Sequence, residues 1–441
     1  MSLGIYISVP FCRTKCSFCN FASGVFSPRS FDPYVTQLCS DIVCAQSEAT
    51  AVGAVLEHEV DSIYLGGGTP SVLAPGHLSQ IFQAVRDNFS IGHGAEITVE
   101  CAPGTISEQI LEALLSCGVN RVSLGVQSFV DRECSSVGRL HTRAIVLDDI
   151  ARLRAAGIGN ISVDLIAGLP HQTEESWDRS LAETLAAGLL HVSVYMLEVD
   201  EDSRLGNELL AGGSRFHAHF VPDEDLTADL YLAACERLEK GGVQQYEISN
   251  FARPVVATPT SAKTALVGDP SANCIGGMCA ESRHNLKYWT RQPYIGFGVD
   301  AHSMLGTLPE LQARGIGAVR FATPDSLEGY LGESGTAGTA VARIQHFRRS
   351  LVQVDQQAAL EESFFLGLRL NRGISPPELR SCFGDAAIDS YAPVVRELAD
   401  AGLMELADDR LRLTPRGRLL SNEVFARFLT GKEKQHCGAG K

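Results

Sequence analysis

Three cysteines lie close together near the start of the chain, at Cys12, Cys16 and Cys19. The spacing C-x3-C-x2-C puts three thiolates on one short loop, and three thiolates can bind three irons of a [4Fe–4S] cluster. The fourth iron of such a cluster has no protein ligand and is open to a small molecule. The sequence therefore predicts a metal site at these three cysteines, with one open coordination position.

Two other uses of cysteine fit this pattern less well. A structural zinc site is normally closed by four ligands in paired C-x2-C knuckles, and no second knuckle follows near Cys19. The chain has 13 cysteines, an odd number, and most are scattered singly, which does not suit a disulfide framework. We expect the thiols to be reduced, because the sequence has no secretory segment.

Composition limits the partners of the chain. It has 441 residues and a formal net charge of −15, and an acidic protein is repelled by phosphate backbones, so we expect no nucleic-acid partner. No apolar run reaches the roughly 18–20 residues that a membrane-spanning helix needs. No basic region precedes the first apolar stretch, so a signal peptide is not predicted and a cytoplasmic location is expected.

Short β-branched and aromatic runs alternate with helical patterns over the first 200 residues. Candidate strands cover Ile5–Val9, Ser62–Leu65, Glu96–Glu100, Arg121–Gly125, Ile161–Ile166 and His191–Met196. The helical patterns between them end at glycines such as Gly118 and Gly157, which are helix stops. Six strand–helix units predict an α/β fold, a partial (β/α)6 TIM-like barrel, whose chemistry lies where the strands end.

Glycines and polar side chains occur at those strand ends. A glycine run at 66–68 follows the second strand, Glu100 ends the third, Gln127 follows the fourth, Arg139 lies twelve residues further on, and Asp164 is late in the fifth. Glycines let backbone N–H groups approach a ligand. Carboxylates suit ammonium and hydroxyl groups, and an arginine suits a carboxylate. Each residue alone is equally consistent with a helix cap or an ion pair, but together they predict a ligand site.

The cysteine spacing resembles the signature of the radical S-adenosylmethionine superfamily, and four further motifs narrow the resemblance. They are Tyr6-x-Ser8-Val9-Pro10-Phe11-Cys12, Gly66-Gly67-Gly68-Thr69-Pro70-Ser71, Gly125-Val126-Gln127-Ser128-Phe129 and Asp164-Leu165-Ile166-Ala167-Gly168-Leu169-Pro170. These motifs resemble the coproporphyrinogen dehydrogenase-like branch, which contains oxygen-independent coproporphyrinogen III oxidases and haem chaperones. The resemblance implies a [4Fe–4S] cluster held by the three cysteines. It also implies contacts to S-adenosyl-L-methionine from Tyr6, Phe18, Gly67, Gly68, Thr69, Glu100, Gln127, Arg139 and Asp164.

Two positions separate the oxidases from the haem chaperones in this branch. The motif of the oxidases resembles C-x3-C-x2-C-x-C, with a further cysteine at its last position. This chain has Phe21 at that position, as the chaperones do. The run from Arg283 to Trp289 resembles the HN-x2-YW motif of the chaperones. Histidine is a common axial ligand of haem iron, and aromatic rings can wall a porphyrin face, so the resemblance implies His284 as a haem ligand beside Tyr288 and Trp289.

The later part of the chain changes in composition. We expect the barrel over residues 1–250, a haem-motif region over 251–350, and a C-terminal helical, winged-helix-like domain over 351–441 with a helix at Ala392–Ala401 and strands at Gly402–Leu406 and Arg410–Thr414. Residues 254–281 are rich in Pro, Gly, Ser, Thr and Ala and are interpreted as a flexible surface insertion that contains Cys274 and Cys279. The insertion directly precedes the histidine motif, where relatives in the branch lack it. The shape of the haem site is therefore left open.

The resemblance implies a haem chaperone that binds haem and passes it to a membrane-associated respiratory haemoprotein. It also implies peripheral contact with the membrane when haem is loaded, and it allows a homodimer. The alternative is an oxygen-independent coproporphyrinogen III oxidase, in which radical chemistry converts two propionates of the porphyrin precursor to vinyl groups with loss of CO₂. A third possibility is radical modification of an unrelated substrate.

Overall fold

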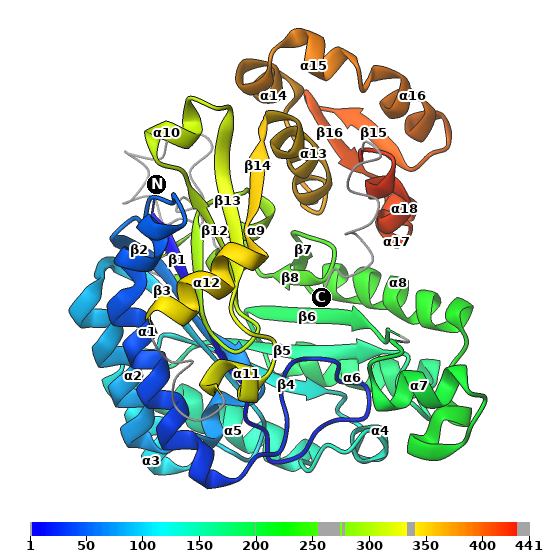
Figure 1. The fold of residues 1–441 in the computed structure, drawn as a ribbon. Coiled ribbons are helices and arrows are strands. Elements are labelled where there is room, and N and C mark those ends of the chain that lie inside the picture. Colours follow the sequence, from blue (N-terminus) through cyan, green and yellow to red (C-terminus); the bar gives the residue numbers. More distant parts are fainter. Residues whose placement is uncertain (1, 199, 255–273, 276–277, 333–339, 430–441) are drawn as a thin grey trace.

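Six parallel strands, each followed by helices, form the centre of the computed structural model (Figure 1). The structure describes residues 2–198, 200–254, 274–275, 278–332 and 340–429. The strands are β1 (Leu3–Val9), β2 (Glu59–Gly67), β3 (Ser90–Cys101), β4 (Arg121–Gln127), β5 (Asn160–Ala167) and β6 (His191–Met196). They lie side by side in chain order and all run parallel, which confirms the predicted partial barrel.

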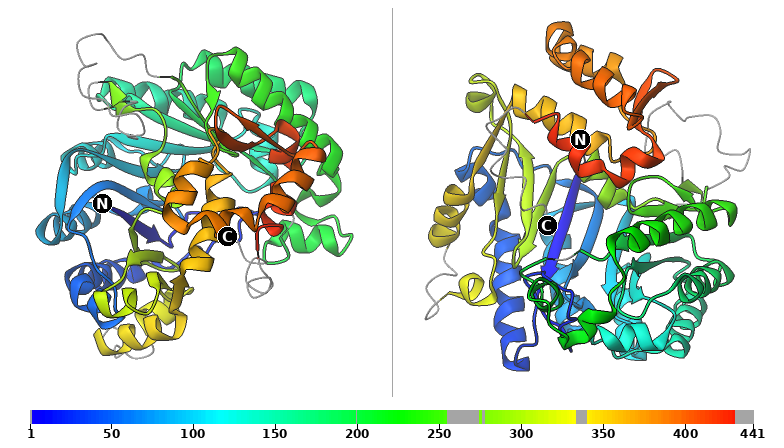
Figure 2. Two further views of the ribbon diagram at one scale, coloured as in Figure 1. Left: turned by 90° about the horizontal axis from the view of Figure 1, so that it is seen from above. Right: turned by 90° about the vertical axis from the view of Figure 1, so that its right-hand side faces the viewer.

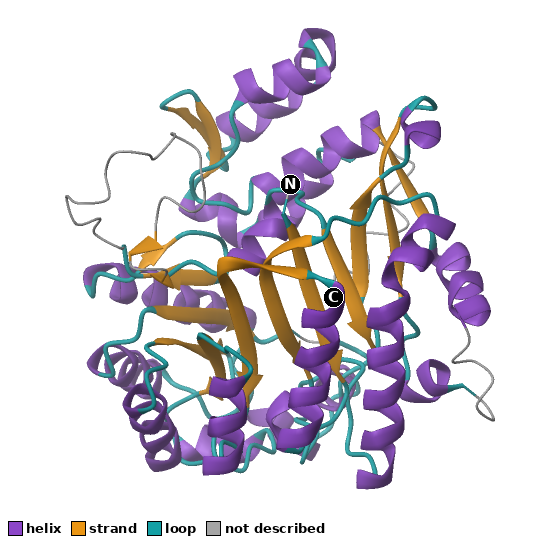
Figure 3. Cartoon of the chain, turned by 90° about the vertical axis from the view of Figure 1, so that its left-hand side faces the viewer, coloured by secondary structure: helices purple, strands orange, loops and turns teal. Residues whose placement is uncertain are grey.

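Helices cover the outer face of the curved sheet (Figure 3). They are α1 (Phe31–Ala51), α2 (Pro75–Asn88), α3 (Glu108–Ser116), α4 (Asp131–Ser136), α5 (Arg143–Ala155), α6 (Glu174–Ala186), α7 (Arg204–Leu210) and α8 (Glu224–Lys240). The predicted glycine stops are confirmed, because Gly118 and Gly157 follow α3 and α5 with φ of 79° and 94°. Such left-handed backbone favours a residue without Cβ.

The side-chain alternation of β1 explains why the inner face can hold a ligand. Leu3, Ile5 and Ile7 are buried in the main hydrophobic core with residues of α1. The intervening Gly4 and Tyr6 point to the opposite face of the sheet, because successive residues of a strand alternate in direction. The inner face of the barrel therefore carries small and polar residues, while the outer face carries the aliphatic ones.

The sheet extends beyond the six predicted strands on both sides. β11 (Tyr294–Gly298) pairs in parallel with β1, and β12 (His302–Gly306), β13 (Ile316–Ala322) and β14 (Val352–Asp355) continue from it in antiparallel pairs. At the other edge, β8 (Asn250–Ala252) and β7 (Gln244–Gln245) follow β6. The described sheet thus has 12 strands, with β1 in its interior and not at its edge.

The C-terminal region forms its own small core. It contains α13 (Gln356–Gly367), α14 (Pro376–Phe383), α15 (Asp385–Asp389), α16 (Ala392–Asp400), the hairpin β15 (Met404–Ala407) and β16 (Arg410–Leu413), α17 (Pro415–Leu419) and α18 (Ser421–Ala426). The rings of Phe364, Tyr391 and Phe428 pack together at its centre, with Phe364 and Phe428 centroids 4.5 Å apart. The predicted helix and both predicted strands are confirmed.

This region and the cysteine loop lie at opposite ends of the barrel (Figures 1 and 2). It contacts the barrel through the ion pair Arg291–Glu362 at 2.8 Å and, near the β7–β8 edge of the sheet, through a β-bridge between Glu247 and Leu370. The loop that follows β1 lies at the end where the strands finish. The domain limits themselves remain a prediction.

The remaining elements are short. They are η1 (Pro28–Ser30), η2 (Pro70–Val72), η3 (Arg215–Phe220), α9 (Arg283–Trp289), α10 (Pro309–Gln312), α11 (Leu327–Leu331), α12 (Ala340–Ser350), and the pair β9 (Cys274–Ile275) and β10 (Met278–Cys279). Of the predicted insertion 254–281, residues 255–273 and 276–277 lie outside the described residues, so its flexibility remains a prediction. No helix in the described part of the chain combines the length and apolarity needed to cross a membrane.

Candidate functional site

The cysteine loop is fixed at both ends by backbone hydrogen bonds. Cys12 N donates to Gly24 O at 2.9 Å, and Gly24 N donates to Pro10 O at 2.9 Å. In the middle of the loop, Ser17 N donates to Val137 O at 3.1 Å, which attaches the loop to the segment after α4. The loop is therefore anchored both to β1 and to the fourth unit of the barrel.

Each of the three thiols has a polar neighbour. Thr69 Oγ1 lies 3.7 Å from the sulfur of Cys12, Arg139 Nη1 lies 3.6 Å from the sulfur of Cys16, and the sulfur of Cys19 is 3.8 Å from a serine hydroxyl. All three thiols are free. Donors of this kind stabilise thiolates, so the donor set suits an iron–sulfur cluster.

Gly68 forms a cradle beside the first cysteine. A Cβ at this position would lie 2.9 Å from the sulfur of Cys12 and 2.8 Å from Phe11 O, so only glycine allows the close approach. Within the described residues, no three histidine, cysteine or carboxylate side chains already converge on a single point. The three cysteines fit a cluster by donor type and by this cradle, and their role as its ligands remains a prediction.

Glu100 organises the glycine-rich edge of the site. Its carboxylate accepts a hydrogen bond from Gly67 N at 3.1 Å and another from the Tyr64 hydroxyl at 2.8 Å. Gly67 has φ of 101°, a conformation that favours glycine. Burial, together with the charge of Asp164, raises the pKa of Glu100 to about 7. A cation bound between the two carboxylates would relieve their repulsion, which suits the ammonium group of a bound amino acid.

The other predicted contacts surround the same space. Burial raises the pKa of Asp164, which accepts a hydrogen bond from Ser123 at 3.1 Å. Arg139 also donates to Gly125 O, and its Nε is buried without a hydrogen-bond partner among the described residues. Gln127 has φ of 67°, an uncommon backbone for a non-glycine residue and one that often marks a functional site. Arg139 therefore keeps one N–H group without a hydrogen-bond partner among the described residues, and a guanidinium N–H suits the carboxylate of a ligand.

Phe18 and Tyr6 complete the set of predicted contacts. Phe18 packs against Val137, Ile166 and Leu169 beneath the cysteine loop. Tyr6 lies beside Tyr64 on the neighbouring strand, with ring centroids 6.1 Å apart. The structure thus places the predicted S-adenosylmethionine residues around the ends of β1 to β5, apart from Tyr6 in the middle of β1, and their contacts to the ligand remain predictions.

His284 lies in a different place, inside the barrel at the end where the strands begin. It is 1% exposed and belongs to α9, which starts with the Ser282 hydroxyl accepting from Asn285 N. Its Nδ1 is 3.1 Å from the Ser62 hydroxyl and its Nε2 is 2.9 Å from the Tyr288 hydroxyl. Burial, followed by the charge of Lys287, lowers the pKa of His284 to about 3, so the ring is neutral.

Both ring nitrogens of His284 are therefore occupied. A bond to haem iron requires the imidazole to give up one partner and to become accessible, and the assignment as a haem ligand remains a prediction. Gly4 makes room for the ring, since a Cβ at Gly4 would lie 3.3 Å from His284 Cε1 and 2.7 Å from Lys287 Cδ. The sequence pattern could not reveal that α9 turns this histidine inward.

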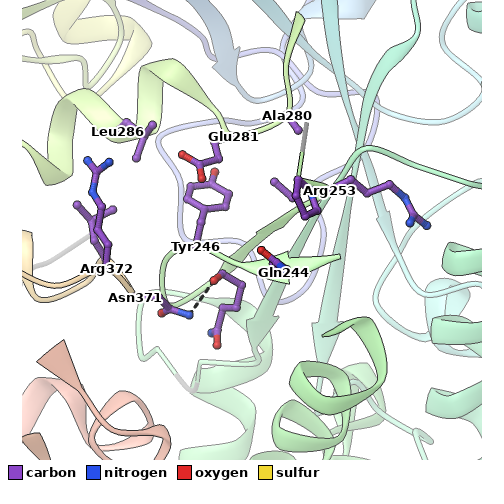
Figure 4. Close-up of a pocket in the computed structure, with 12 residues that line it drawn as sticks. Gln244, Tyr246, Arg253, Ala280, Glu281, Leu286, Asn371 and Arg372 are labelled. Atoms are coloured by element: carbon purple, nitrogen blue, oxygen red, sulfur yellow. Dashed lines mark hydrogen bonds between the residues drawn. The ribbon is translucent and has the colours of Figure 1, made fainter. Parts of the chain in front are cut away.

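A cavity of about 340 Å³ lies on the other side of α9 (Figure 4). Its wall combines the apolar Leu286 and Leu370 with Tyr246, Glu281 and Arg372, and further residues come from β7, β8 and the segment after α13. Burial raises the pKa of Glu281, and the charge of Arg372 opposes this shift. The cavity therefore lies between β7, β8 and α9 on one side and the segment after α13 on the other, and none of the three cysteines lines it.

Sequence reasoning missed several residues of the inner face. Ser62 and Tyr64 alternate with Ile63 on β2, and this period of two, continued to Gly66, was the signal that could have placed both on the inner face, where Tyr64 contacts Glu100 and Ser62 contacts His284. The parallel strand β11 was also missed, although its glycines allow very close packing on β1. A Cβ at Gly298 would lie 2.3 Å from Ser8 O.

Comparison with known proteins agrees with this geometry. Residues 6–183 match the Radical SAM superfamily, and residues 354–420 match the HemN C-terminal domain. The heme chaperone HemW of Bacillus subtilis is 30% identical over 425 residues, covering 96% of this chain and 98% of the relative. The heme chaperone HemW of Synechocystis is 32% identical over 456 residues, covering 98% of both chains. The chain belongs to the HemW family.

Membership of the HemW family fixes the cofactors and the fold. As radical S-adenosylmethionine proteins, its members use a [4Fe–4S] cluster and S-adenosyl-L-methionine. The solved structure of HemN, the coproporphyrinogen III oxidase from Escherichia coli, superposes with a TM-score of 0.74 at 21% identity, covering 97% of this chain and 90% of that one. The HemW family and HemN thus share one fold. The choice between a chaperone and an oxidase therefore has to be argued from individual side chains.

Proposed function

We propose that this chain is a haem chaperone, which binds haem and transfers it to a haemoprotein. Two relatives named heme chaperone match it over nearly its full length. The observation that carries the choice between chaperone and oxidase is Phe21. Phe21 occupies the position at which the oxidase motif has a further cysteine. Its side chain is 56% exposed beside the cysteine loop. An exposed ring at the mouth of the site suits contact with a partner better than chemistry within the pocket.

In this proposal the residues around the cofactor site act as a structural scaffold for the chaperone. When bound, the cluster and S-adenosylmethionine supply one-electron chemistry. The residues of the chain orient these groups: Glu100 and Asp164 face the cationic part of the ligand, and Arg139 offers an unpaired N–H group near the thiols. In a chaperone, these contacts fix the loop that follows β1 and so shape the surface around Phe21.

Haem titration tests the proposal. Anaerobically reconstituted protein should bind haem at a stoichiometric level with a defined Soret band, and His284→Ala should shift that band and weaken binding. His191→Ala is a matched control, because His191 is 2% exposed and lies between Ser162 at 2.7 Å and Tyr246 at 2.9 Å, as His284 lies between its own serine and tyrosine. Equal spectra for both variants and the wild type would remove His284 as the ligand, and the absence of haem binding would refute the function.

An oxidase activity is the second candidate, because the fold matches HemN and the same residues are predicted to bind the cluster and S-adenosylmethionine. In that reaction two propionates of coproporphyrinogen III lose CO₂ and hydrogen and become vinyl groups. Anaerobic incubation of the reconstituted protein with coproporphyrinogen III, S-adenosylmethionine and a reductant distinguishes the two. Protoporphyrinogen formation above that of a Cys16→Ala variant would favour the oxidase.

The finer features of the chaperone are also part of the proposal. The acceptor is proposed to be a membrane-associated respiratory haemoprotein, and the chaperone a cytoplasmic protein that contacts the membrane peripherally when haem is loaded. Homodimer formation is proposed as well. Size-exclusion chromatography with light scattering, with and without haem, together with vesicle co-sedimentation, tests the oligomer and the membrane contact.

A further inference from the structure

A continuous column of side chains connects the histidine helix to the glycine-rich edge. The His284 ring stacks on Tyr64 with centroids 5.4 Å apart, and it also stacks on Tyr6 at 6.2 Å. The Tyr64 hydroxyl then donates to Glu100 at 2.8 Å, and Glu100 accepts from Gly67 N. Only one ring and one carboxylate therefore lie between the haem motif and the backbone that is predicted to hold S-adenosylmethionine.

The column is closely packed over β2. A Cβ at Gly66 would lie 2.9 Å from both Glu100 Cδ and Tyr64 Cε1, so these two groups lie directly over the strand. On the other side, the His284 ring is held by hydrogen bonds to Ser62 and Tyr288, and its backbone N–H donates to Glu96 Oε1 at 3.2 Å. Close-packed interiors transmit displacement, because a moved ring leaves a void that its neighbours must fill or leave unpacked.

We infer that His284 is a positioning residue for the S-adenosylmethionine edge, and that capture of haem by His284 and binding of S-adenosylmethionine oppose each other. The second half of this inference rests on the proposed function. In the buried position, His284 holds Tyr64 against Glu100. If the imidazole moves to ligate iron, Tyr64 loses its stacking partner and Glu100 loses the support of the tyrosine hydroxyl.

The sign of the coupling follows from this geometry. Haem favours the state with His284 displaced, whereas S-adenosylmethionine favours the state with Glu100 in place. Each ligand therefore lowers the affinity for the other by the same factor, because binding linkage is reciprocal. A cluster with bound S-adenosylmethionine would keep haem away from His284, and loss of that ligand would open the histidine to haem.

Three variants separate positioning from ligation in cluster-reconstituted protein under anaerobic conditions. Calorimetric titration with S-adenosylmethionine, without haem, should show about five- to tenfold weaker binding for His284→Ala, the amount expected for loss of one stacked and hydrogen-bonded support. His284→Gln should restore much of the affinity, because an amide can bond to both hydroxyls. His191→Ala should bind as the wild type does, because no hydrogen bond connects His191 to Glu100.

A second measurement reports on the column itself. Tyr64→Phe keeps the ring but removes the hydroxyl that stabilises the ionised Glu100, so the pH midpoint of S-adenosylmethionine binding should move to a higher pH. A role limited to general packing would leave this midpoint unchanged.

The coupling is tested by repeating the titration with saturating haem. The wild type should bind S-adenosylmethionine about fivefold more weakly with haem than without it, and His284→Gln should show no such difference, since glutamine does not ligate haem iron. S-adenosylmethionine affinity of His284→Ala within twofold of that of His191→Ala would overturn the positioning role. Equal wild-type affinities with and without haem would overturn the coupling. Failure of the wild type to bind haem would refute the proposed function, while the haem-free titrations would still decide the positioning role.

Discussion

Replacing Gly68 with alanine tests whether the glycine run and the cysteine loop act as one site. The added Cβ would lie 2.8 Å from Phe11 O, 2.9 Å from Val9 O and 2.9 Å from the sulfur of Cys12. Two of these neighbours are backbone oxygens, which cannot turn away as a side chain can. Overpacking of this kind typically costs about 1–3 kcal/mol, and relief requires the cysteine loop to move away from the strand.

We therefore expect Gly68→Ala to fold but to lose much of its iron and sulfide after anaerobic reconstitution, with a lower melting temperature. Gly76→Ala is the matched control, because no atom lies within 4 Å of the Cβ it would add. It lies in α2, where alanine is favoured over glycine by up to about 1 kcal/mol, so its stability should be equal or higher. Iron content and melting temperature of Gly68→Ala equal to those of the wild type would refute the proposed contact between the glycine run and the cluster loop.

Four further outcomes follow from burial and charge. Burial and the charge of Asp164 raise the pKa of Glu100 to about 7, so S-adenosylmethionine affinity measured by calorimetry should increase as pH rises through about 7, and Glu100→Gln should remove that dependence. The same raised pKa makes the free energy of unfolding contributed by Glu100 decrease as pH rises from 4.5 to about 7. In this range the folded state still binds the proton and the unfolded state has released it. His284 has the opposite sign: its pKa is lowered to about 3, so stability is lost as pH falls below 6.5, by about 2 kcal/mol at pH 5, and urea unfolding of His284→Gln should lose correspondingly less. Phe21→Ala should change the unfolding free energy by less than about 0.5 kcal/mol and leave the iron content unchanged, because the ring is 56% exposed; a large loss of either would make Phe21 a structural residue.

The local pattern of the sequence was sufficient for the parallel core of the fold. The six strands are short runs rich in β-branched and aliphatic residues, and several helices are followed by a glycine with positive φ, such as Gly118 and Gly157. The cysteine spacing and the strand-end residues from Glu100 to Asp164 were found for the same reason, since their meaning depends on nearby residues. Short stretches of sequence were therefore sufficient to predict the barrel and the residues at the end where its strands finish.

The other end of the interior depends on contacts between distant residues. Ser62 and His284 are separated by 222 positions in the sequence. No residue near His284 in the sequence shows that Gly4 leaves space for its ring inside the barrel. The sequence around His284 would be the same whether the side chain were an exposed haem ligand or a buried residue that positions its neighbours. The strand β11 escaped notice for a similar reason, because its parallel partner β1 lies almost 300 residues away.

The position of β1 between β2 and β11 has a consequence for synthesis of the protein. Leu3, Ile5 and Ile7 are made long before residues 294–298, and until those residues follow, one hydrogen-bonding edge of β1 has no partner. A nascent chain that ends before this point presents an apolar strand with an open edge, which is prone to pair with other chains. The cysteine loop follows directly on that strand, so one of its anchors, at Pro10, stays beside an incompletely paired strand until then, while its contacts to Gly24 and Val137 can form earlier. We therefore expect a fragment limited to the first 183 residues to aggregate more readily than the full chain and to retain less iron after reconstitution.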